Sequence, residues 1–295
     1  MKLGIACVYF YGPDGDWIMD LQLRYMASML SGYDYKIYAG ANRLQPNLRA
    51  RLEAAPHLEV VSLPWFSGEA SDEHAFYLDR LLQRAAADGC THLATLDADA
   101  FPLLPGWPDA LLQRMGKRIR LAAVLRAENL DTHLPHPCGL FMERSFFLDH
   151  MPHMLPPQSE ISSPAFQEFL RETGQRIDTG IGYGYVLWKN QEPWLPLIRS
   201  NSWNAHFLLA GIYGDVFFHL GAGSRRQHFY AEYARNPLLA VAVKLGGVPL
   251  LWRVGAWLSR RIKERRAPCN ARAFLFIADA LKKNPERFIM RLRCI

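Results

Sequence analysis

Two acidic residues separated by one position follow a short apolar run near residue 95. His92–Leu96 has the composition of a buried strand and leads directly into Asp97-Ala98-Asp99. In an extended backbone, residues i and i+2 point to the same side, so both carboxylates can reach one point. Adjacent carboxylates repel each other unless a cation lies between them, and such hard oxygen ligands suit Mg²⁺ or Mn²⁺. A solvated turn at the end of a strand is the structural alternative.

The residues before this acid pair alternate between strand-like and helix-like patterns. Apolar strand-like runs occur at Leu3–Tyr9, Asp34–Ala39 and Leu58–Leu63, and helical spacing occurs in Ile18–Leu30, Gln45–Ala55 and Asp72–Ala87. This alternation predicts an α/β fold with a mostly parallel sheet and flanking helices, in which ligands bind outside the carboxyl ends of the strands. After a strand at Ile119–Leu125 the regularity weakens, and proline-rich loops are expected at Leu134–Pro137 and Met151–Pro157.

The composition of the 295 residues fits one large folded domain with a smaller appendage. Half of the residues are hydrophobic and 12% are aromatic, which excludes a mainly disordered chain. The five cysteines are odd in number and form no CxxC pair, which argues against a disulfide framework and favours a reducing compartment. The N-terminus lacks the cleavage site of a signal peptide, and no uninterrupted apolar stretch predicts a membrane span. We therefore expect a cytoplasmic location.

Positive charge is concentrated at the C-terminal end of the chain. The whole sequence has a formal charge of +6, but residues 251–295 contain 12 Lys and Arg against 3 acids. That segment therefore carries +9, and residues 1–250 carry −3. Because the body is mildly acidic, the basic balance belongs to one segment and gives no reason to expect nucleic acid as a partner.

The run LDADAFP at residues 96–102 resembles the DxD motif of GT-A glycosyltransferases, in particular the nucleotide-sugar-dependent enzymes similar to family 2. The resemblance extends over about residues 1–230 and is specific only around Asp97–Pro102. It implies a GT-A-like (Rossmann-like) fold and transfer of a sugar from a nucleotide-diphosphate sugar to an acceptor hydroxyl, with Mn²⁺ or Mg²⁺. Asp99 would then bind the metal directly, and Asp97 would face the ribose or the metal.

The same resemblance implies further ligands for the metal and the diphosphate. His219 ends the apolar run Phe217–His219 and would be the third metal ligand, by similarity to GT-A enzymes with a late histidine. Gly221 and Gly223 would allow the backbone to approach phosphate, and Arg225 or its neighbour Arg226 would neutralise the departing diphosphate. A histidine at the edge of the core beside a surface turn is the structural alternative.

Nucleotide contacts are expected at the end of the first strand and on the helix that precedes the acid pair. In GT-A folds the nucleobase commonly lies at the end of the first strand, which implies contacts from Tyr9, Tyr11 and Asp14. His74 occupies the position of a nucleotide-flanking helix. The base, the sugar and the acceptor (a glycan, a lipid-linked molecule or a small molecule) all remain open.

Asp178, in the glycine-rich run Arg176–Tyr185, is the candidate catalytic base. Inverting glycosyl transfer requires a carboxylate that removes the acceptor proton, and the family often supplies it from such a segment. Asp178 could equally cap a helix over Ile181–Lys189. The acidic pair that many family 2 enzymes use as a base motif is absent, so inversion and retention both remain open.

Three potential metal ligands, His133, His136 and Cys138, occur together in THLPHPCG. Their spacing matches no standard zinc site and no fourth ligand lies nearby in the sequence. We therefore interpret this segment as an acceptor-side loop that enters a new strand at Cys138–Phe141.

The basic segment 250–266 has apolar residues at helical spacing, two tryptophans and six Lys or Arg residues. Such a helix suits the surface of an anionic membrane, here at its inner face. A helix packed on the catalytic domain with a solvated basic face is the alternative.

These patterns predict a glycosyltransferase-like domain at 1–235, with a donor-binding part at 1–126 and an acceptor side at 127–235, followed by a basic helical appendage at 236–295. Two other functions stay open. One is a non-catalytic module that binds a nucleotide sugar or lipid. The other is a phosphohydrolase with a strand-DxD motif, although that class usually carries the motif on its first strand with Thr or Val where this chain has Phe101.

Overall fold

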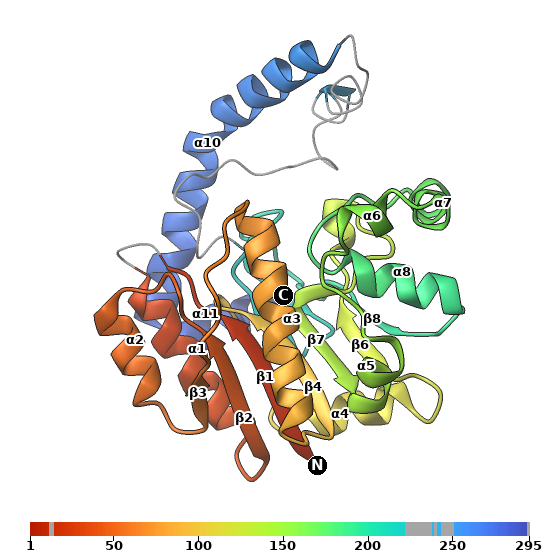
Figure 1. The fold of residues 1–295 in the computed structure, drawn as a ribbon. Helices are drawn as coiled ribbons and strands as arrows, with labels where there is room; N and C mark the ends of the chain where they lie inside the picture. The colour runs from red at the N-terminus through yellow and green to blue at the C-terminus, as the bar shows by residue number, and fades with distance from the viewer. Residues whose placement is uncertain (12–14, 222–237, 239–240, 243–250, 294–295) are drawn as a thin grey trace.

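A seven-stranded sheet forms the centre of the molecule, in the order β3-β2-β1-β4-β7-β6-β8 (Figure 1). Its strands are β1 (Lys2–Val8), β2 (Asp34–Gly40), β3 (Leu58–Val60), β4 (His92–Asp97), β6 (Leu121–Val124), β7 (His136–Glu143) and β8 (Leu195–Leu197). Four of the six neighbouring pairs are parallel, and β7 runs antiparallel to both of its neighbours. The predicted α/β fold with a mostly parallel sheet is confirmed.

The computed structural model describes the chain except for residues 12–14, 222–237, 239–240, 243–250 and 294–295. The predicted contacts Asp14, Gly223, Arg225 and Arg226 lie outside the described residues, so they stay predictions.

A second, three-stranded antiparallel sheet adjoins the carboxyl end of β4. It contains β5 (Ala100–Pro102), β10 (Phe217–His219) and β9 (Gly211–Tyr213), in that order. Only Ala98 and Asp99 separate β4 from β5, so the acid pair lies where the chain passes from one sheet to the other. His219 is the register partner of Ala100, which places this histidine beside the acid pair.

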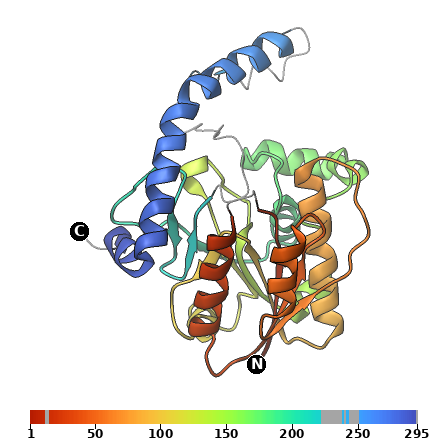
Figure 2. The ribbon, with the colours of Figure 1, turned by 90° about the vertical axis from the view of Figure 1, so that its left-hand side faces the viewer.

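Helices cover both faces of the central sheet, as the two views in Figure 1 and Figure 2 show. The helices are α1 (Asp16–Met29), α2 (Pro46–Glu53), α3 (Ala70–Ala87), α4 (Trp107–Met115), the 3-10 turn η1 (Ala127–Asn129), α5 (Arg144–His150), α6 (Gln158–Ile161), α7 (Pro164–Thr173), α8 (Ile181–Asn190), α10 (Trp252–Lys283) and α11 (Pro285–Arg293). Side chains alternate along a strand, so β1 supplies Ile5 to one core and Ala6 to the other. Met26 and Trp107 pack in the first core, and Leu81 in the second.

The predicted helical appendage is present as α10 and α11. α10 extends well beyond the rest of the described chain in both views (Figures 1 and 2). Its C-terminal part is anchored, because Ile277 and Leu281 join the first core together with Phe288 and Leu292 of α11. Residues 252–266 of the predicted cationic segment 250–266 form the N-terminal half of α10, which lies farther from this anchor, and residue 250 lies outside the described residues.

The expected loop at Leu134–Pro137 is partly wrong, because β7 already begins at His136. Its first residues pair with β6 across a register irregularity at Ala123/Val124, where Val124 is opposite His136. A strand with two prolines near its start gives little local signal, and the pairing partner supplies the missing stabilisation. The expected loop after Met151 is confirmed.

Glycines in α8 allow the chain to pack closely against this helix. A Cβ atom on Gly184 would lie 1.9 Å from the carbonyl oxygen of His133, and one on Gly182 would lie 2.0 Å from that of His153. Both contacts are with backbone, which cannot rotate away. The run GIGYGY therefore brings the chain before β7 onto the helix that follows Asp178.

Gly184→Ala should destabilise the protein by about 1–3 kcal/mol, because the added methyl group overlaps backbone in a packed interior. A fall of several degrees in the melting temperature is expected. Gly40→Ala is the matched control, since its Cβ would meet only side-chain atoms, Leu63 Cδ1 at 3.1 Å, Leu81 Cδ1 at 3.5 Å and Val8 Cγ2 at 3.6 Å. Equal melting temperatures for the two variants would contradict this account of α8.

Candidate functional site

A pocket of about 600 Å³ opens at the carboxyl ends of β1 and β4. The strand order reverses between these two strands, since β1 leads outward to β2 and β3 while β4 starts the other half of the sheet. Ligand sites of open α/β sheets lie at such a switch point. All predicted site residues that the structure describes line this pocket: Tyr9, Tyr11, His74, Asp97, Asp99, Asp178 and His219.

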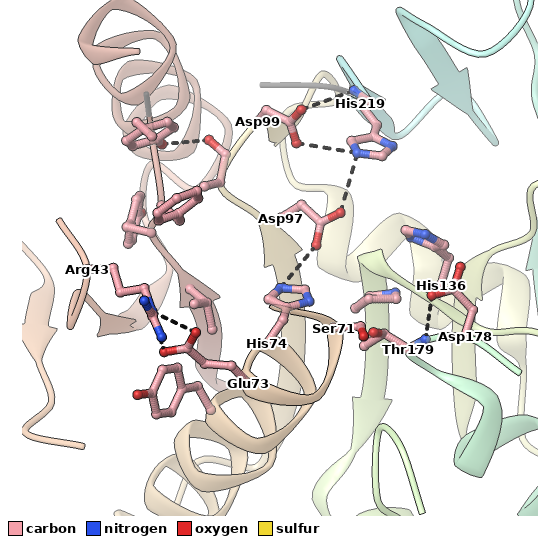
Figure 3. A pocket seen from close by; sticks show the side chains of 18 of the residues that line it. Arg43, Ser71, Glu73, His74, Asp97, Asp99, His136, Asp178, Thr179 and His219 are labelled. Atoms are coloured by element: carbon pink, nitrogen blue, oxygen red, sulfur yellow. Dashed lines mark hydrogen bonds and ion pairs between the residues drawn. The ribbon is translucent and has the colours of Figure 1, made fainter. Parts of the chain in front are cut away.

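The three predicted metal ligands meet inside the pocket. The Nε2 atom of His219 lies 3.3 Å from Asp97 Oδ2 and 3.3 Å from Asp99 Oδ1, as Figure 3 shows. His219 is 5% exposed and Asp99 is 8% exposed, so this contact is shielded from solvent. A histidine 120 residues beyond the acid motif therefore bridges both carboxylates.

A buried glutamine on α1 fixes the chain on either side of the acid pair. The Nε2 atom of Gln22 donates to the carbonyl oxygens of Asp97 at 2.8 Å and Ala100 at 2.7 Å. The side chain of Gln22 is fully buried. One amide group thus joins the last residue of β4 to the first residue of β5.

The two residues inside the turn are held by other elements. The hydroxyl of Tyr11 donates to the carbonyl oxygen of Ala98 at 2.7 Å. The backbone N–H of Leu220 donates to the carbonyl oxygen of Asp99 at 3.0 Å, and that of Gly221 donates to Asp99 Oδ2 at 3.1 Å. The four carbonyls from Asp97 to Ala100 are thus all held from outside the turn, which preorganises both carboxylates.

The charges of this cluster depend on one another. Burial raises the pKa of Asp97, but a hydrogen bond from His219 and the electrostatic interactions with the neighbouring histidines outweigh it, so the net pKa lies well below the usual range. Burial opposes a charge on His219, but the sulfur of Cys138 and the carboxylate of Asp99 raise its pKa well above the usual value. Without a metal ion, a protonated His219 therefore balances one of the two negative charges of the acid pair.

The donor set also fits a divalent cation in place of that proton. Asp97 Oδ1 is buried with no hydrogen-bond partner among the described residues, and it faces His74 Nε2 at 3.6 Å. Ligand atoms of Asp97, Cys138 and His219 all lie within 4.8 Å of one another. The sequence analysis predicted Asp97, Asp99 and His219 as the three ligands, whereas this compact group contains Cys138 as its third member. Asp99 stays a predicted ligand.

Sequence reasoning missed the contribution of β7. His136 is buried in the pocket wall, with its ring centroid 5.8 Å from that of His219. The backbone N–H of Cys138 donates to His136 Nδ1 at 3.2 Å, and burial together with the charge of Arg126 lowers the pKa of His136 well below its usual value. The run His136-Pro137-Cys138 was the available signal, but Asp97 and His219 are about 40 and about 80 residues away from it in the sequence.

The far wall of the pocket carries a charged pair. Arg43 Nε lies 2.7 Å from Glu73 Oε2 (Figure 3). The Arg43 guanidinium also lies 4.8 Å from the ring centroid of Trp65. Both charged residues line the pocket next to His74. This pair had no signal in the sequence, because two loops and a helix bring it together.

Asp178 lies exposed at the pocket, on the side of His136 and Thr179 (Figure 3). Its Oδ1 accepts a hydrogen bond from the backbone N–H of Thr179 at 2.8 Å. The alternative role as a helix cap is wrong, because α8 is capped by Gly180, which has φ of 105°. The carboxylate of Asp178 is therefore available to the pocket.

No family model and no curated protein matches this chain. Among solved structures, a mannosyltransferase from Pyrobaculum calidifontis in complex with GDP-Man and Mn²⁺ is 13% identical, with 50% of this chain and 46% of that one covered and a TM-score of 0.37. S. aureus TarS 1–349 in complex with UDP-GlcNAc is 10% identical, with 90% and 72% covered and a TM-score of 0.39. A cytidylyltransferase from Leptospira borgpetersenii is 12% identical, with 72% and 80% covered and a TM-score of 0.40.

The chain spans about half the length of the mannosyltransferase that it matches. At these identities the comparison concerns the fold alone.

Gln22→Met should destabilise the protein by about 2–4 kcal/mol, because two carbonyl groups lose their buried donor. Gln113→Met on the exposed face of α4 is the matched control and should leave stability nearly unchanged. Chemical denaturation of both variants measures the difference. A Gln22→Met protein as stable as the control would show that the amide does not hold the turn.

Proposed function

We propose that this protein is a metal-dependent glycosyltransferase that moves a sugar from a nucleotide-diphosphate sugar to an acceptor hydroxyl. The observation that carries the proposal is the meeting of Asp97, Asp99 and His219 at the switch point of the sheet, with 3.3 Å between the histidine and each carboxylate. A buried acid pair is stabilised by a cation, and a divalent ion would balance both carboxylates where the proton of His219 balances one.

Asp97, Asp99 and His219 would hold the cation against the donor diphosphate. When bound, Mn²⁺ or Mg²⁺ would stabilise the negative charge of the leaving diphosphate. The hydrogen bonds to the four carbonyls of Asp97–Ala100 keep the two carboxylates in place, so that little reorganisation is needed when the donor binds.

Tyr9, Tyr11 and His74 would contact the nucleotide from the ends of β1 and α3, where all three line the pocket. Asp14 and Arg225 keep their predicted roles at the nucleobase and the diphosphate. The hydroxyl of Tyr11 already donates a hydrogen bond to the carbonyl oxygen of Ala98. Tyr11 would therefore contact the nucleotide through the face or edge of its ring.

Asp178 would act as the general base if the transfer inverts the anomeric centre. Its carboxylate is exposed to the pocket and oriented by Thr179, so it could accept the proton of the acceptor hydroxyl as the new glycosidic bond forms. The acceptor would enter from the side formed by α8 and the start of β7, which belongs to the predicted acceptor part at 127–235.

Asp99→Asn should lower donor turnover at least about a hundredfold, because one charge of the cation site is lost. The assay is the release of nucleoside diphosphate from a panel of nucleotide sugars with Mn²⁺. Asp34 is exposed at the amino end of β2, whereas the pocket lies at the carboxyl ends of the strands. Asp34→Asn is therefore the matched control and should keep full activity.

Two outcomes would separate the other functions. Donor binding in a thermal-shift assay without any turnover would indicate a binding module, because a ligand of the folded state raises the melting temperature. Turnover of phosphomonoesters in place of nucleotide sugars would contradict the transferase proposal and support the phosphohydrolase.

We also propose that the basic half of α10 docks on an anionic membrane surface. No helix in the described part of the chain is long and apolar enough to cross a membrane. Val254 and Trp257 are 53% and 60% exposed, and Arg260 and Arg261 are exposed on the same part of the helix. Exposed apolar side chains beside arginines fit the interface of an anionic bilayer.

Arg260→Glu/Arg261→Glu should weaken binding of the full chain to phosphatidylserine vesicles at least about tenfold, since each cation near the surface contributes about 1 kcal/mol. Lys117→Glu/Arg118→Glu makes the same charge change on an exposed loop and serves as the control. Co-sedimentation at low and high salt measures both. Equal loss in the two variants would indicate a general charge effect and would contradict docking through α10.

A further inference from the structure

Cys138 is a fully buried thiol in the wall of the proposed cation site. Its side chain is 0% exposed, and its sulfur belongs to the compact donor group with Asp97 and His219. The three residues come from β7, β4 and β10, so three separate strands converge on one point. The sulfur has no role in the function proposed above.

The fold places the sulfur there through the pairing of β7 with β4. The two strands are antiparallel, and Thr95 opposite Leu140 is their last register pair before β7 passes through the irregularity opposite Ala123/Val124. The hydroxyl of Thr95 donates to the carbonyl oxygen of Pro137 at 2.8 Å, which extends the attachment of β7 to β4 toward Cys138.

Gly139 lets the third strand approach. A Cβ atom at this position would lie 2.7 Å from the Phe217 ring and 2.8 Å from the side chain of Val124. Because Gly139 lacks that atom, Phe217 packs directly on β7, and His219, two residues along β10, reaches the sulfur of Cys138. The contact between sulfur and imidazole thus depends on the packing of two sheets.

The distances suit a single ion with sulfur, nitrogen and oxygen ligands. Zinc–sulfur bonds are about 2.3 Å and zinc–nitrogen bonds about 2.1 Å, so at a tetrahedral angle a sulfur and a nitrogen on one ion lie about 3.6 Å apart. The donors of Asp97, Cys138 and His219 all lie within 4.8 Å of one another, so the most distant pair would move together by up to about 1.2 Å when an ion binds.

We propose that Cys138 is a ligand of the cation site, and that the site selects a thiophilic ion such as Zn²⁺ or Co²⁺ over Mg²⁺. The proposal rests on the cation site of the proposed function and changes its donor set. Asp97 and His219 complete the group, and Asp99, 3.3 Å from His219, is placed to supply a fourth donor. On binding, the thiol and the imidazolium each release a proton to the solvent, and the sulfur and nitrogen lone pairs bind the ion.

The preference follows from the softness of the ligands. A thiolate binds Zn²⁺ and Co²⁺ far better than Mg²⁺, which prefers oxygen ligands and retains several waters. A site built only from the two carboxylates would bind Mg²⁺ and Mn²⁺ without using sulfur. Coordination by Cys138 would therefore favour Zn²⁺ or Co²⁺, whereas a site without it would favour Mg²⁺ or Mn²⁺.

Cobalt provides the direct test, because coordination of Co²⁺ by a thiolate gives a near-ultraviolet charge-transfer absorption that oxygen and nitrogen ligands do not produce. Metal-free full-length protein is titrated with CoCl₂ alone. The absorption should develop in the wild type and in Cys90→Ser, and it should be lost in Cys138→Ser. Cys90 is the matched control, since it is also fully buried but lies at the other end of β4.

Zinc affinity, measured by competition with a chelating dye, should fall at least about tenfold in Cys138→Ser and stay unchanged in Cys90→Ser. Cobalt or zinc binding of equal strength in all three proteins, without the charge-transfer band, would overturn the role of Cys138 and leave the carboxylate site intact. Absence of any divalent-metal binding in the wild type would overturn both proposals.

Cys138→Ser and Cys138→Ala place a polar or smaller group in a packed interior, so their folding is checked by circular dichroism. X-ray absorption at the zinc edge uses the wild type and needs no variant. A sulfur neighbour at about 2.3 Å from zinc is expected. A shell of nitrogen and oxygen alone would contradict the proposal.

Discussion

The placement of two carboxylates in a shielded pocket is the constraint on which the rest of this structure depends. Asp97 and Asp99 cannot both stay ionised in the interior without a positive charge, and His219 supplies it from the second sheet. β10 pairs with β5, and the chain crosses from one sheet to the other immediately after Asp97, which brings His219 to both carboxylates.

The parallel sheet makes such a site possible by directing several strands to one edge. β1 and β4 end beside each other, and β7 enters the same edge from the opposite direction with His136 and Cys138. Hydrogen bonds from Gln22 and Tyr11 then fix the turn between the strands and the second sheet. The rigidity of the acid pair thus comes from elements that carry no catalytic group themselves.

Local sequence patterns predicted most of the strands and helices, and also the acid pair, because each depends on residues close together in the chain. The pattern of an apolar strand ending in His219 was likewise local. The sulfur of Cys138 was not predictable as a neighbour of Asp97, since that contact depends on the register between β4 and β7. The helix cap at Gly180 was missed because it depends on a positive φ angle, which the pair Asp178-Thr179 does not reveal. Asp14 and Arg225 lie outside the described residues.

The 32-residue helix α10 also sets a length scale for the molecule. From the anchored Ile277 back to Trp252 the helix axis runs for about 38 Å at 1.5 Å per residue. Pro268 lies inside this stretch and removes one backbone hydrogen bond, so the axis bends there, as Figure 1 shows, and the helix separates the core from its own basic end along a bent path. The number of residues in α10 would therefore set the distance between the pocket and a surface bound at the basic end of the helix. Inserting or deleting one helical turn would change the length of the helix by about 5.4 Å.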